Sequence, residues 1–380
     1  MLKKKWRSEY HEISHYNIFL ILVFLLNSIT TWAQDSTSVT EPLYKNKVLF
    51  LPALGSSPET GFMFGAVVVP QFKLGAPDSG TRSSSVFTSA IYTTKKQILV
   101  SILPDIILPG ESWTLNSNYF ANYYPESYWG LGPSSSKEDE ITTLYTQINL
   151  EQNALRKVGS GLFTGPKMRW SKTVNVTFEN SDGESIPAPE ITGSEGYTST
   201  GLGWIARWDR RNSNMTPTKK YYVQFTLMGN PSWLSSSDSY TSYELDARKY
   251  LALSGNSQSV LALQTLVQLN LGEPPFNDLA TLGGDRINRG YYNGRYRDQN
   301  AAQFQAELRQ HFMGRFGFTL FAATGEVWNR FYHFTLDHNK WTGGAGLRFN
   351  VNKDDPTNVR IDFGISKEST GFYLQFGEAF

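Results

Sequence analysis

The chain has 380 residues, no cysteine and a formal net charge of +1. A near-neutral chain lacks the basic excess that binding to nucleic acid requires, so nucleic acid is excluded as a partner. Aromatic residues make up 14% of the sequence and charged residues only 18%. That combination would leave large apolar patches on a soluble protein, but it is expected of a β-barrel whose outer face meets lipid.

The first segment, residues 1–33, has the pattern of a secretory signal peptide that is cleaved on export. Four basic residues precede an apolar run at 18–26, and the small residues Thr31 and Ala33 precede a polar stretch. The apolar run is too short to span a bilayer as a helix. After cleavage, residues 34–45 would form a short periplasmic segment. An exported chain without disulfides needs another source of stability, such as closure of a sheet.

The rest of the chain has the period of β-strands. No later stretch reaches about 18 consecutive apolar residues, which excludes a helical membrane protein. Along 303–312 the odd positions are all polar and the even positions are mostly apolar, and similar alternation recurs at 359–366 and 372–377. Each of these strands therefore has one face suited to water and one suited to an apolar environment.

The alternation and the turn residues between strands predict sixteen strands, at 46–55, 61–72, 83–93, 96–104, 112–124, 142–153, 161–173, 199–208, 219–229, 240–252, 258–270, 301–313, 315–328, 341–351, 358–366 and 371–380. The long connections all join an odd-numbered strand to the next even-numbered one. Outer-membrane barrels place long loops outside and short turns in the periplasm. We therefore predict an all-β fold, a single 16-stranded antiparallel transmembrane β-barrel over 46–380, located in the bacterial outer membrane.

One connection, residues 282–300, carries more charge than a passive hairpin loop needs. Its nineteen residues include four arginines, two aspartates, four glycines and three tyrosines. The glycines do not form a phosphate-binding loop, because no strand-to-helix context follows and the lysine of such loops is absent.

This loop and the strands after it resemble the BamA/TamA family of outer-membrane barrels, also called the bacterial surface antigen family. The family's sixth extracellular loop folds inward and carries an Arg-Gly-(Phe/Tyr) triplet after a Gly-Gly pair. The matching residues here are Gly283, Gly284, Arg289, Gly290 and Tyr291. The resemblance covers about residues 46–380 and is densest after 280, so it implies the same barrel with an inward-folded loop.

Further landmarks follow the loop. The strand "QFQAELRQ" is similar to the family's strand that turns a glutamate, here Glu307, toward the lumen. The last segment, "GFYLQFGEAF", is similar to the family's terminal strand, which acts as a C-terminal signal for delivery to the assembly machinery. Its apolar residues at alternate positions are Phe372, Leu374, Phe376 and Phe380.

The sequence departs from the family pattern in two places. Members with assembly or secretion roles carry periplasmic POTRA domains before the barrel, and none fits before residue 46, so the resemblance implies a member lacking them. The family's aspartate on the strand at 315–328 is replaced by Ala323. The alternation leaves Glu307 and Asp362 as lumen-facing candidates to pair with Arg289, whose guanidinium can bind a carboxylate bidentately. The alternative is a solvated surface loop of mixed charge.

The resemblance implies a barrel that assists insertion of outer-membrane proteins or protein translocation, with lipid and other outer-membrane or periplasmic proteins as partners. The alternative is a passive pore or surface-anchoring barrel without a client. No enzyme activity is expected, because a Gly-x-Ser-x-Gly motif is absent. No cofactor or metal is expected either, because the histidines beyond the signal, His311, His333 and His338, fit solvated positions better than a metal site.

Overall fold

The computed structural model describes residues 46–75, 81–255, 258–352 and 357–380. The predicted signal peptide at 1–33 and the predicted periplasmic segment at 34–45 lie outside the described residues. Within the described ranges, no helix has both the length and the apolar character needed to cross a bilayer.

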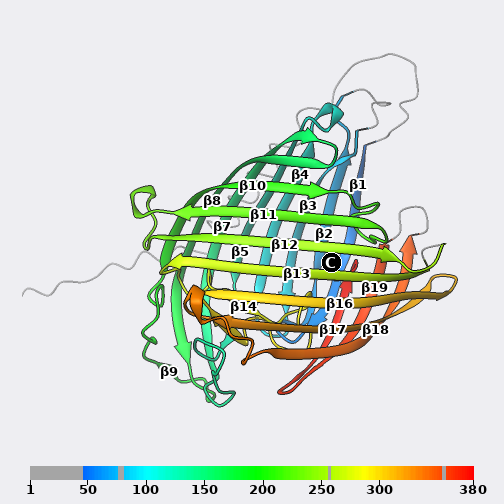
Figure 1. Ribbon diagram of the computed structural model, residues 1–380. Helices are drawn as coiled ribbons and strands as arrows, with labels where there is room; N and C mark the ends of the chain where they lie inside the picture. Colours follow the sequence, from blue (N-terminus) through cyan, green and yellow to red (C-terminus); the bar gives the residue numbers. More distant parts are fainter. Residues whose placement is uncertain (1–45, 76–80, 256–257, 353–356) are drawn as a thin grey trace, which may run out of the picture. The chain divides into compact units, whose positions relative to one another are not determined.

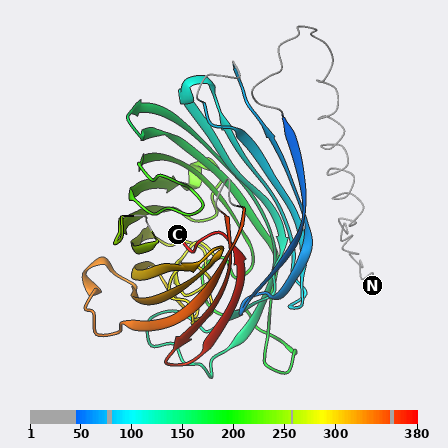
Figure 2. The ribbon, with the colours of Figure 1, turned by 90° about the vertical axis from the view of Figure 1, so that its right-hand side faces the viewer.

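Within the described part of the chain, sixteen antiparallel strands form the wall of a barrel (Figures 1 and 2). They are β1 (Lys47–Ser57), β2 (Gly61–Phe72), β3 (Ser84–Thr93), β4 (Ile98–Ile107), β5 (Trp113–Tyr123), β7 (Ile141–Gly159), β8 (Leu162–Glu179), β10 (Tyr197–Asp209), β11 (Lys220–Asn230), β12 (Tyr240–Ala252), β13 (Ser259–Gly272), β16 (Asn300–Met313), β17 (Phe316–Trp328), β18 (Lys340–Asn352), β19 (Thr357–Ser366) and β20 (Thr370–Phe376). Each wall strand pairs with the next one along the chain. The predicted 16-stranded antiparallel barrel is confirmed.

The barrel closes where β1 meets β20, and we call this junction the seam. Ser56 paired with Leu374 is the only residue pair that joins the two strands within the described ranges. By contrast, β1 pairs with β2 over eleven residue pairs and β19 pairs with β20 over seven. The seam is therefore the least hydrogen-bonded junction of the wall.

Shorter elements lie in the connections. β6 (Glu126–Tyr128) and β9 (Ser185–Ile186) extend the wall by pairing with β7 and β8. β14 (Ala280–Leu282) and β15 (Tyr296–Asp298) form a separate two-stranded sheet within the connection between β13 and β16. The 3-10 turns are η1 (Pro109–Glu111), η2 (Ser232–Leu234) and η3 (Phe331–His333).

The alternation seen in the sequence becomes two faces of the wall. On β16, Gln303, Gln305 and Glu307 are buried on the inner face, whereas Phe304 is 44% exposed on the outer face. An apolar outer face suits lipid, and closure lets backbone groups pair within the wall. The short connections, such as 160–161 and 314–315, lie at one end of the barrel, the short-turn end. The long connections lie at the other, the long-loop end.

The end of the chain differs from the prediction. The last strand was predicted to run over 371–380, but β20 ends at Phe376. Gly377 has a φ of +82°, a conformation that favours glycine, and it turns the following residues away from the wall. Phe380 is only 4% exposed and lies against Tyr250 of β12, with ring centroids 6.2 Å apart. Phe372 and Phe376 remain on the outer face, so Phe380 does not continue their apolar row.

Candidate functional site

The connection between β13 and β16, residues 273–299, lies against the inner face of the wall, and we call it the inner loop (Figure 2). Gly283 and Gly284 both have positive φ where the chain leaves β14. The Gly284 N–H donates to the Tyr291 carbonyl at 3.1 Å, which closes the loop on itself. Tyr291 is buried, and its ring makes an edge contact with that of Tyr296 at 5.5 Å.

Arg289 projects from the tip of the inner loop to two carboxylates on the wall. Its Nη2 lies 2.6 Å from Glu307 of β16 and its Nη1 lies 2.5 Å from Asp362 of β19. All three side chains are fully buried. The guanidinium also stacks over the Phe321 ring of β17, 3.6 Å from its centroid. Two carboxylates and an aromatic ring therefore hold the arginine.

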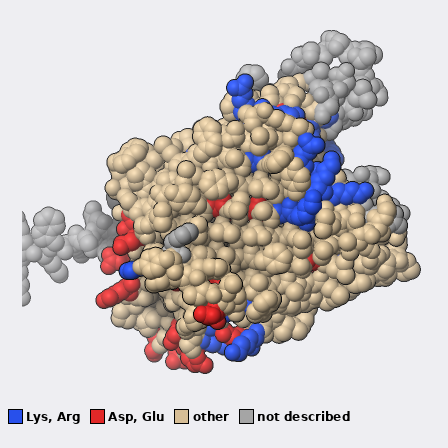
Figure 3. Space-filling model, in the orientation of Figure 1, with Lys and Arg blue, Asp and Glu red and all other residues tan. Residues whose placement is uncertain are grey.

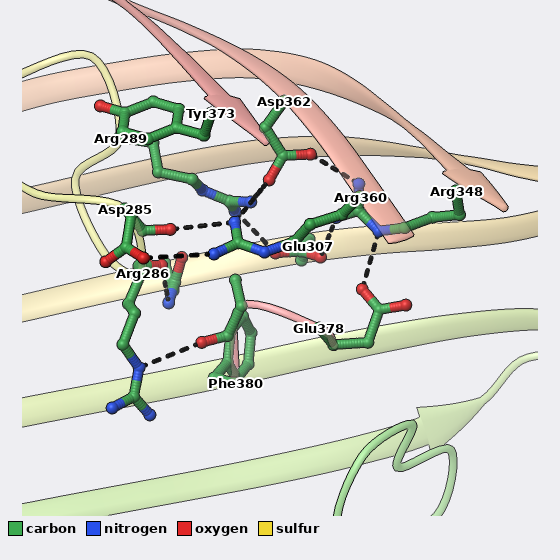
Figure 4. Close-up of polar contacts among 12 residues, drawn as sticks. Asp285, Arg286, Arg289, Glu307, Arg348, Arg360, Asp362, Tyr373, Glu378 and Phe380 are labelled. Carbon is green, nitrogen blue, oxygen red and sulfur yellow. Dashed lines mark hydrogen bonds and ion pairs between the residues drawn. The ribbon is translucent and has the colours of Figure 1, made fainter. Parts of the chain in front are cut away.

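Three further arginines surround the same two carboxylates, and Figure 4 shows two of them, Arg348 and Arg360, near Asp362. Arg309 and Arg348 lie 3.1 and 3.3 Å from Glu307. Arg348 and Arg360 lie 2.5 and 2.9 Å from Asp362. Removing one partner from a buried ion pair leaves an uncompensated charge and costs several kcal/mol. We call Arg289, Arg309, Arg348, Arg360, Glu307, Asp362 and Glu378 the lumen network.

Glu378, just beyond β20, joins this network from the other side. It lies 2.8 Å from Arg348 and 3.7 Å from Arg309. The Arg309 Nη2 also donates to the Phe380 carbonyl at 3.0 Å. The last residues of the chain therefore fold into the lumen because charged groups on β16 and β18 bind them there.

The backbone of the inner loop approaches β19 very closely at Gly290, which has a φ of +119°. Its N–H donates to the Tyr373 hydroxyl at 2.9 Å, and its carbonyl accepts from the Ser369 hydroxyl at 2.6 Å. A Cβ on Gly290 would lie 2.8 Å from the Ile365 carbonyl carbon, and one on Gly364 would lie 2.5 Å from the Arg289 carbonyl oxygen. Glycine is therefore required on both surfaces of this contact.

Replacing Gly290 with Ala is expected to release the inner loop from the wall. The added methyl group would meet backbone atoms of β19 and strain the backbone, at a cost of about 1–3 kcal/mol or more. Limited proteolysis of the folded barrel should then cut the loop faster. Gly183→Ala is the matched control, because Gly183 also has a positive φ, of +79°, but open space around it. Equal protection in the two variants would contradict the close-contact argument.

The inner loop has a second set of contacts near the long-loop end. The Asn293 N–H donates to Glu59, in the β1–β2 turn, at 2.7 Å. The Tyr292 hydroxyl accepts from the Ser127 N–H at 3.2 Å. Burial raises the pKa of the Glu59 carboxyl, and the hydrogen bonds from the Ser57 side chain and the Asn293 backbone oppose that rise. The loop thus contacts both the first hairpin and, through Gly290, the last strand.

The lumen is only partly filled. One polar cavity of about 520 Å³ lies toward the long-loop end and is lined by residues that include Glu126, Arg169 and Asp278. Another of about 560 Å³ lies toward the short-turn end and is lined by residues that include Arg82, Arg207 and Asp209. Within the described residues, no group of three or more His, Asp or Glu side chains is arranged to hold a metal ion.

The residues singled out in the sequence fall into two groups. Arg289, Gly290, Glu307 and Asp362 come together at one contact, and Gly283, Gly284 and Tyr291 shape the loop behind it. Phe372, Leu374 and Phe376 lie on β20, away from this contact. Sequence reasoning missed five residues of this contact: Arg309, Arg348, Arg360, Tyr373 and Glu378. Arg309, Arg360 and Tyr373 nevertheless occupy lumen-facing positions of strands whose alternation is plain in the sequence.

Comparisons with known proteins agree with this architecture. A search of curated protein sequences gave no match. Among solved structures, the chain is similar to BamA from Haemophilus ducreyi lacking POTRA domains 1-3, with a TM-score of 0.60, 12% identity, and coverage of 88% of this chain and 70% of that one. It is also similar to CdiB from Acinetobacter baumannii, with a TM-score of 0.53, 14% identity, and coverage of 87% and 59%.

CdiB from Escherichia coli gives a TM-score of 0.56 at 9% identity, with coverage of 89% of this chain and 63% of that one. The chain thus spans less than two thirds of either CdiB structure, and at these identities the likeness establishes the fold alone. The family model of the Omp85 superfamily domain matches residues 100–380. Because that match covers well over half of the sequence, the chain belongs to the Omp85 superfamily and is an outer-membrane β-barrel protein.

Proposed function

We propose that this barrel assists the insertion of other proteins into the outer membrane or their translocation across it. The observation that supports this proposal is the seam, where Ser56 and Leu374 form one residue pair. Unpaired backbone groups in lipid cost several kcal/mol each, so a sparsely paired junction is the easiest part of the wall to open. An open strand edge can then pair with a strand of another protein.

The outer face beside the seam suits such a client. Phe50 and Leu54 on β1 are 75% and 60% exposed, and Phe62 on β2 is 63% exposed. These side chains would meet lipid or the apolar face of an incoming strand. Client strands should therefore crosslink to photoreactive residues placed on β1 or β20. They should not crosslink to residues placed on β11, the ninth wall strand, which is far from the seam.

A disulfide across the seam tests the proposal, since the chain has no cysteine of its own. A disulfide between cysteines introduced at Ser56 and Leu374 should slow the assisted folding of a small outer-membrane protein into liposomes by about tenfold or more. A tenfold slower rate corresponds to ~1.4 kcal/mol of added barrier. Reductant should restore the rate. The matched control joins Ala66 and Ala90, which pair between β2 and β3. If both disulfides leave the rate unchanged, the seam does not act in insertion.

The polar cavities at both ends support a second candidate function, a passive pore. Planar-bilayer conductance separates the two functions. A steady open conductance without client crosslinks would favour the pore, whereas a closed lumen with crosslinks would favour insertion. Purification in mild detergent would add a further test, because a barrel that inserts proteins is expected to retain an outer-membrane or periplasmic partner.

A further inference from the structure

The exposed acidic residues of the described chain lie at one end of the barrel, whereas exposed basic residues occur at both ends (Figure 3). At the short-turn end no described Asp or Glu is exposed, and the exposed basic residues are Lys47, Arg82, Arg156, Lys157, Lys219, Lys220, Lys249 and Arg315. At the long-loop end the exposed acidic residues are Glu138, Asp139, Glu140, Asp182, Glu184, Glu190, Glu195, Glu273 and Asp337. The short-turn end of an outer-membrane barrel faces the periplasm.

Three of the lysines gather with two aromatic rings at the ends of β10, β11 and β12. Lys249 lies directly opposite Tyr221 in the strand register, and its Nζ lies 5.6 Å from the Tyr221 ring centroid. The Tyr221 ring makes an edge contact with the Trp208 ring at 5.0 Å. Lys219 and Lys220 immediately precede Tyr221. We call these five residues the basic patch.

Lys249, Tyr221 and Trp208 of the basic patch lie on the outer surface of the wall, whereas Lys220 pairs with Tyr250 at the strand end. Along β12, Arg248 and Tyr250 turn inward, whereas Lys249 shares the outer face with Leu245 and Leu251, which are 37% and 39% exposed. Trp208 is 47% exposed on the same surface. Tyrosine and tryptophan on the outer face of a barrel collect at the level of the lipid head groups. The Lys249 amine is therefore placed beside those head groups, and Lys219 and Lys220 are exposed at the adjoining strand end.

The turn that carries two of the lysines is held in place. The side-chain oxygen of Asn212 accepts hydrogen bonds from the backbone N–H groups of Thr218 and Lys219, both at 3.0 Å. Asp209, at the end of β10, pairs with Arg211 at 2.7 Å. Within the described ranges, no carboxylate forms an ion pair with any lysine of the patch.

We propose that the basic patch binds the phosphate groups of anionic phospholipids in the periplasmic leaflet. The ammonium groups of the patch can donate hydrogen bonds to phosphate oxygens, and the attraction adds to the partitioning of the aromatic rings. Lipid fits the patch better than an acidic protein does, because Lys249 lies on the same face as leucines that meet hydrocarbon. A soluble partner would have to enter the bilayer to reach it.

The test uses the full barrel in nanodiscs of phosphatidylethanolamine with a minor fraction of phosphatidylglycerol. Native mass spectrometry of the released barrel should show retained phosphatidylglycerol. The triple variant K219Q/K220Q/K249Q should lower that retention by about tenfold, and raised salt should weaken it only in part at this interfacial site. K219R/K220R/K249R should retain the lipid, because the charges remain.

The matched control is K95Q/K96Q/K137Q, which removes three exposed lysines from the long-loop end. It should leave lipid retention unchanged, and heat-modifiable migration should show that every variant is folded. An equal loss in both triple variants would overturn the proposal, since it would show only an effect of net charge. Unchanged lipid retention together with loss of a co-purifying acidic periplasmic protein would also overturn it.

Discussion

Replacing Glu307 with Gln is expected to prevent stable assembly of the barrel. Glu307 is fully buried and pairs with Arg289, Arg309 and Arg348. The substitution keeps the size of the side chain and removes one of the carboxylates that balance four buried guanidinium groups. Loss of a partner from a buried charge pair costs about 3–5 kcal/mol. Heat-modifiable migration after refolding should show little or none of the compact form.

Glu244→Gln is the matched control for this change. Glu244 also lies on a wall strand, accepts a hydrogen bond from Gln268 at 3.3 Å, and forms no ion pair within the described ranges. The same chemical change there should leave most of the barrel compact. Similar losses in the two variants would show that Glu307 is no more important than another lumen carboxylate, and the lumen network would lose its structural role.

Replacing Arg289 with Ala should have a different result. The remaining Arg309, Arg348 and Arg360 still balance Glu307, Asp362 and Glu378, so the wall is expected to assemble. The inner loop, however, loses its two ion pairs and its contact with the Phe321 ring. Truncating one partner of a buried, hydrogen-bonded charge pair at an interface costs about 2–5 kcal/mol. A non-specific protease should therefore cut the loop in an otherwise compact barrel.

Arg286→Ala provides the comparison, because Arg286 lies in the same loop and its guanidinium donates only to the Ala379 carbonyl, at 3.3 Å, within the described part of the chain. Its removal should leave the loop protected. Unchanged protection and unchanged migration for Arg289→Ala would show that the two ion pairs do not hold the loop.

Strand alternation allowed the barrel to be predicted because it depends only on residues close together in the sequence. Counting every second residue along one strand is enough to identify its lumen-facing positions. The same counting placed Glu307 and Asp362 on the inner face. It could not show that Arg348 and Arg360 share those carboxylates, because that depends on the stagger between strands set by the turns. The sparse pairing at the seam was equally invisible, since it depends on how the two ends of the sheet meet.

Phe380 shows where alternation misleads. It continues the even-numbered row of Phe372, Leu374 and Phe376, so the pattern predicted an outward aromatic on the final strand. Gly377 interrupts that row with a backbone conformation that the sequence pattern does not register. The charges on Arg309 and Arg348 then bind the following residues inside. The backbone turn at Gly377 therefore lets Phe380 lie inside the lumen, although the alternation of the sequence predicted an outward position.

The inner loop touches both sides of the seam. The Asn293 N–H of the loop donates to the Glu59 carboxylate in the first hairpin, and the loop reaches the last strand and its turn through the Gly290–Tyr373 and Tyr296–Glu368 hydrogen bonds. Separating β1 from β20 therefore stretches the loop between two attachment points. A client that binds the widened barrel lowers the affinity of the loop for the wall. By linkage, the bound loop lowers the affinity for that client by the same factor. Loop occupancy and wall opening thus form one reciprocal equilibrium.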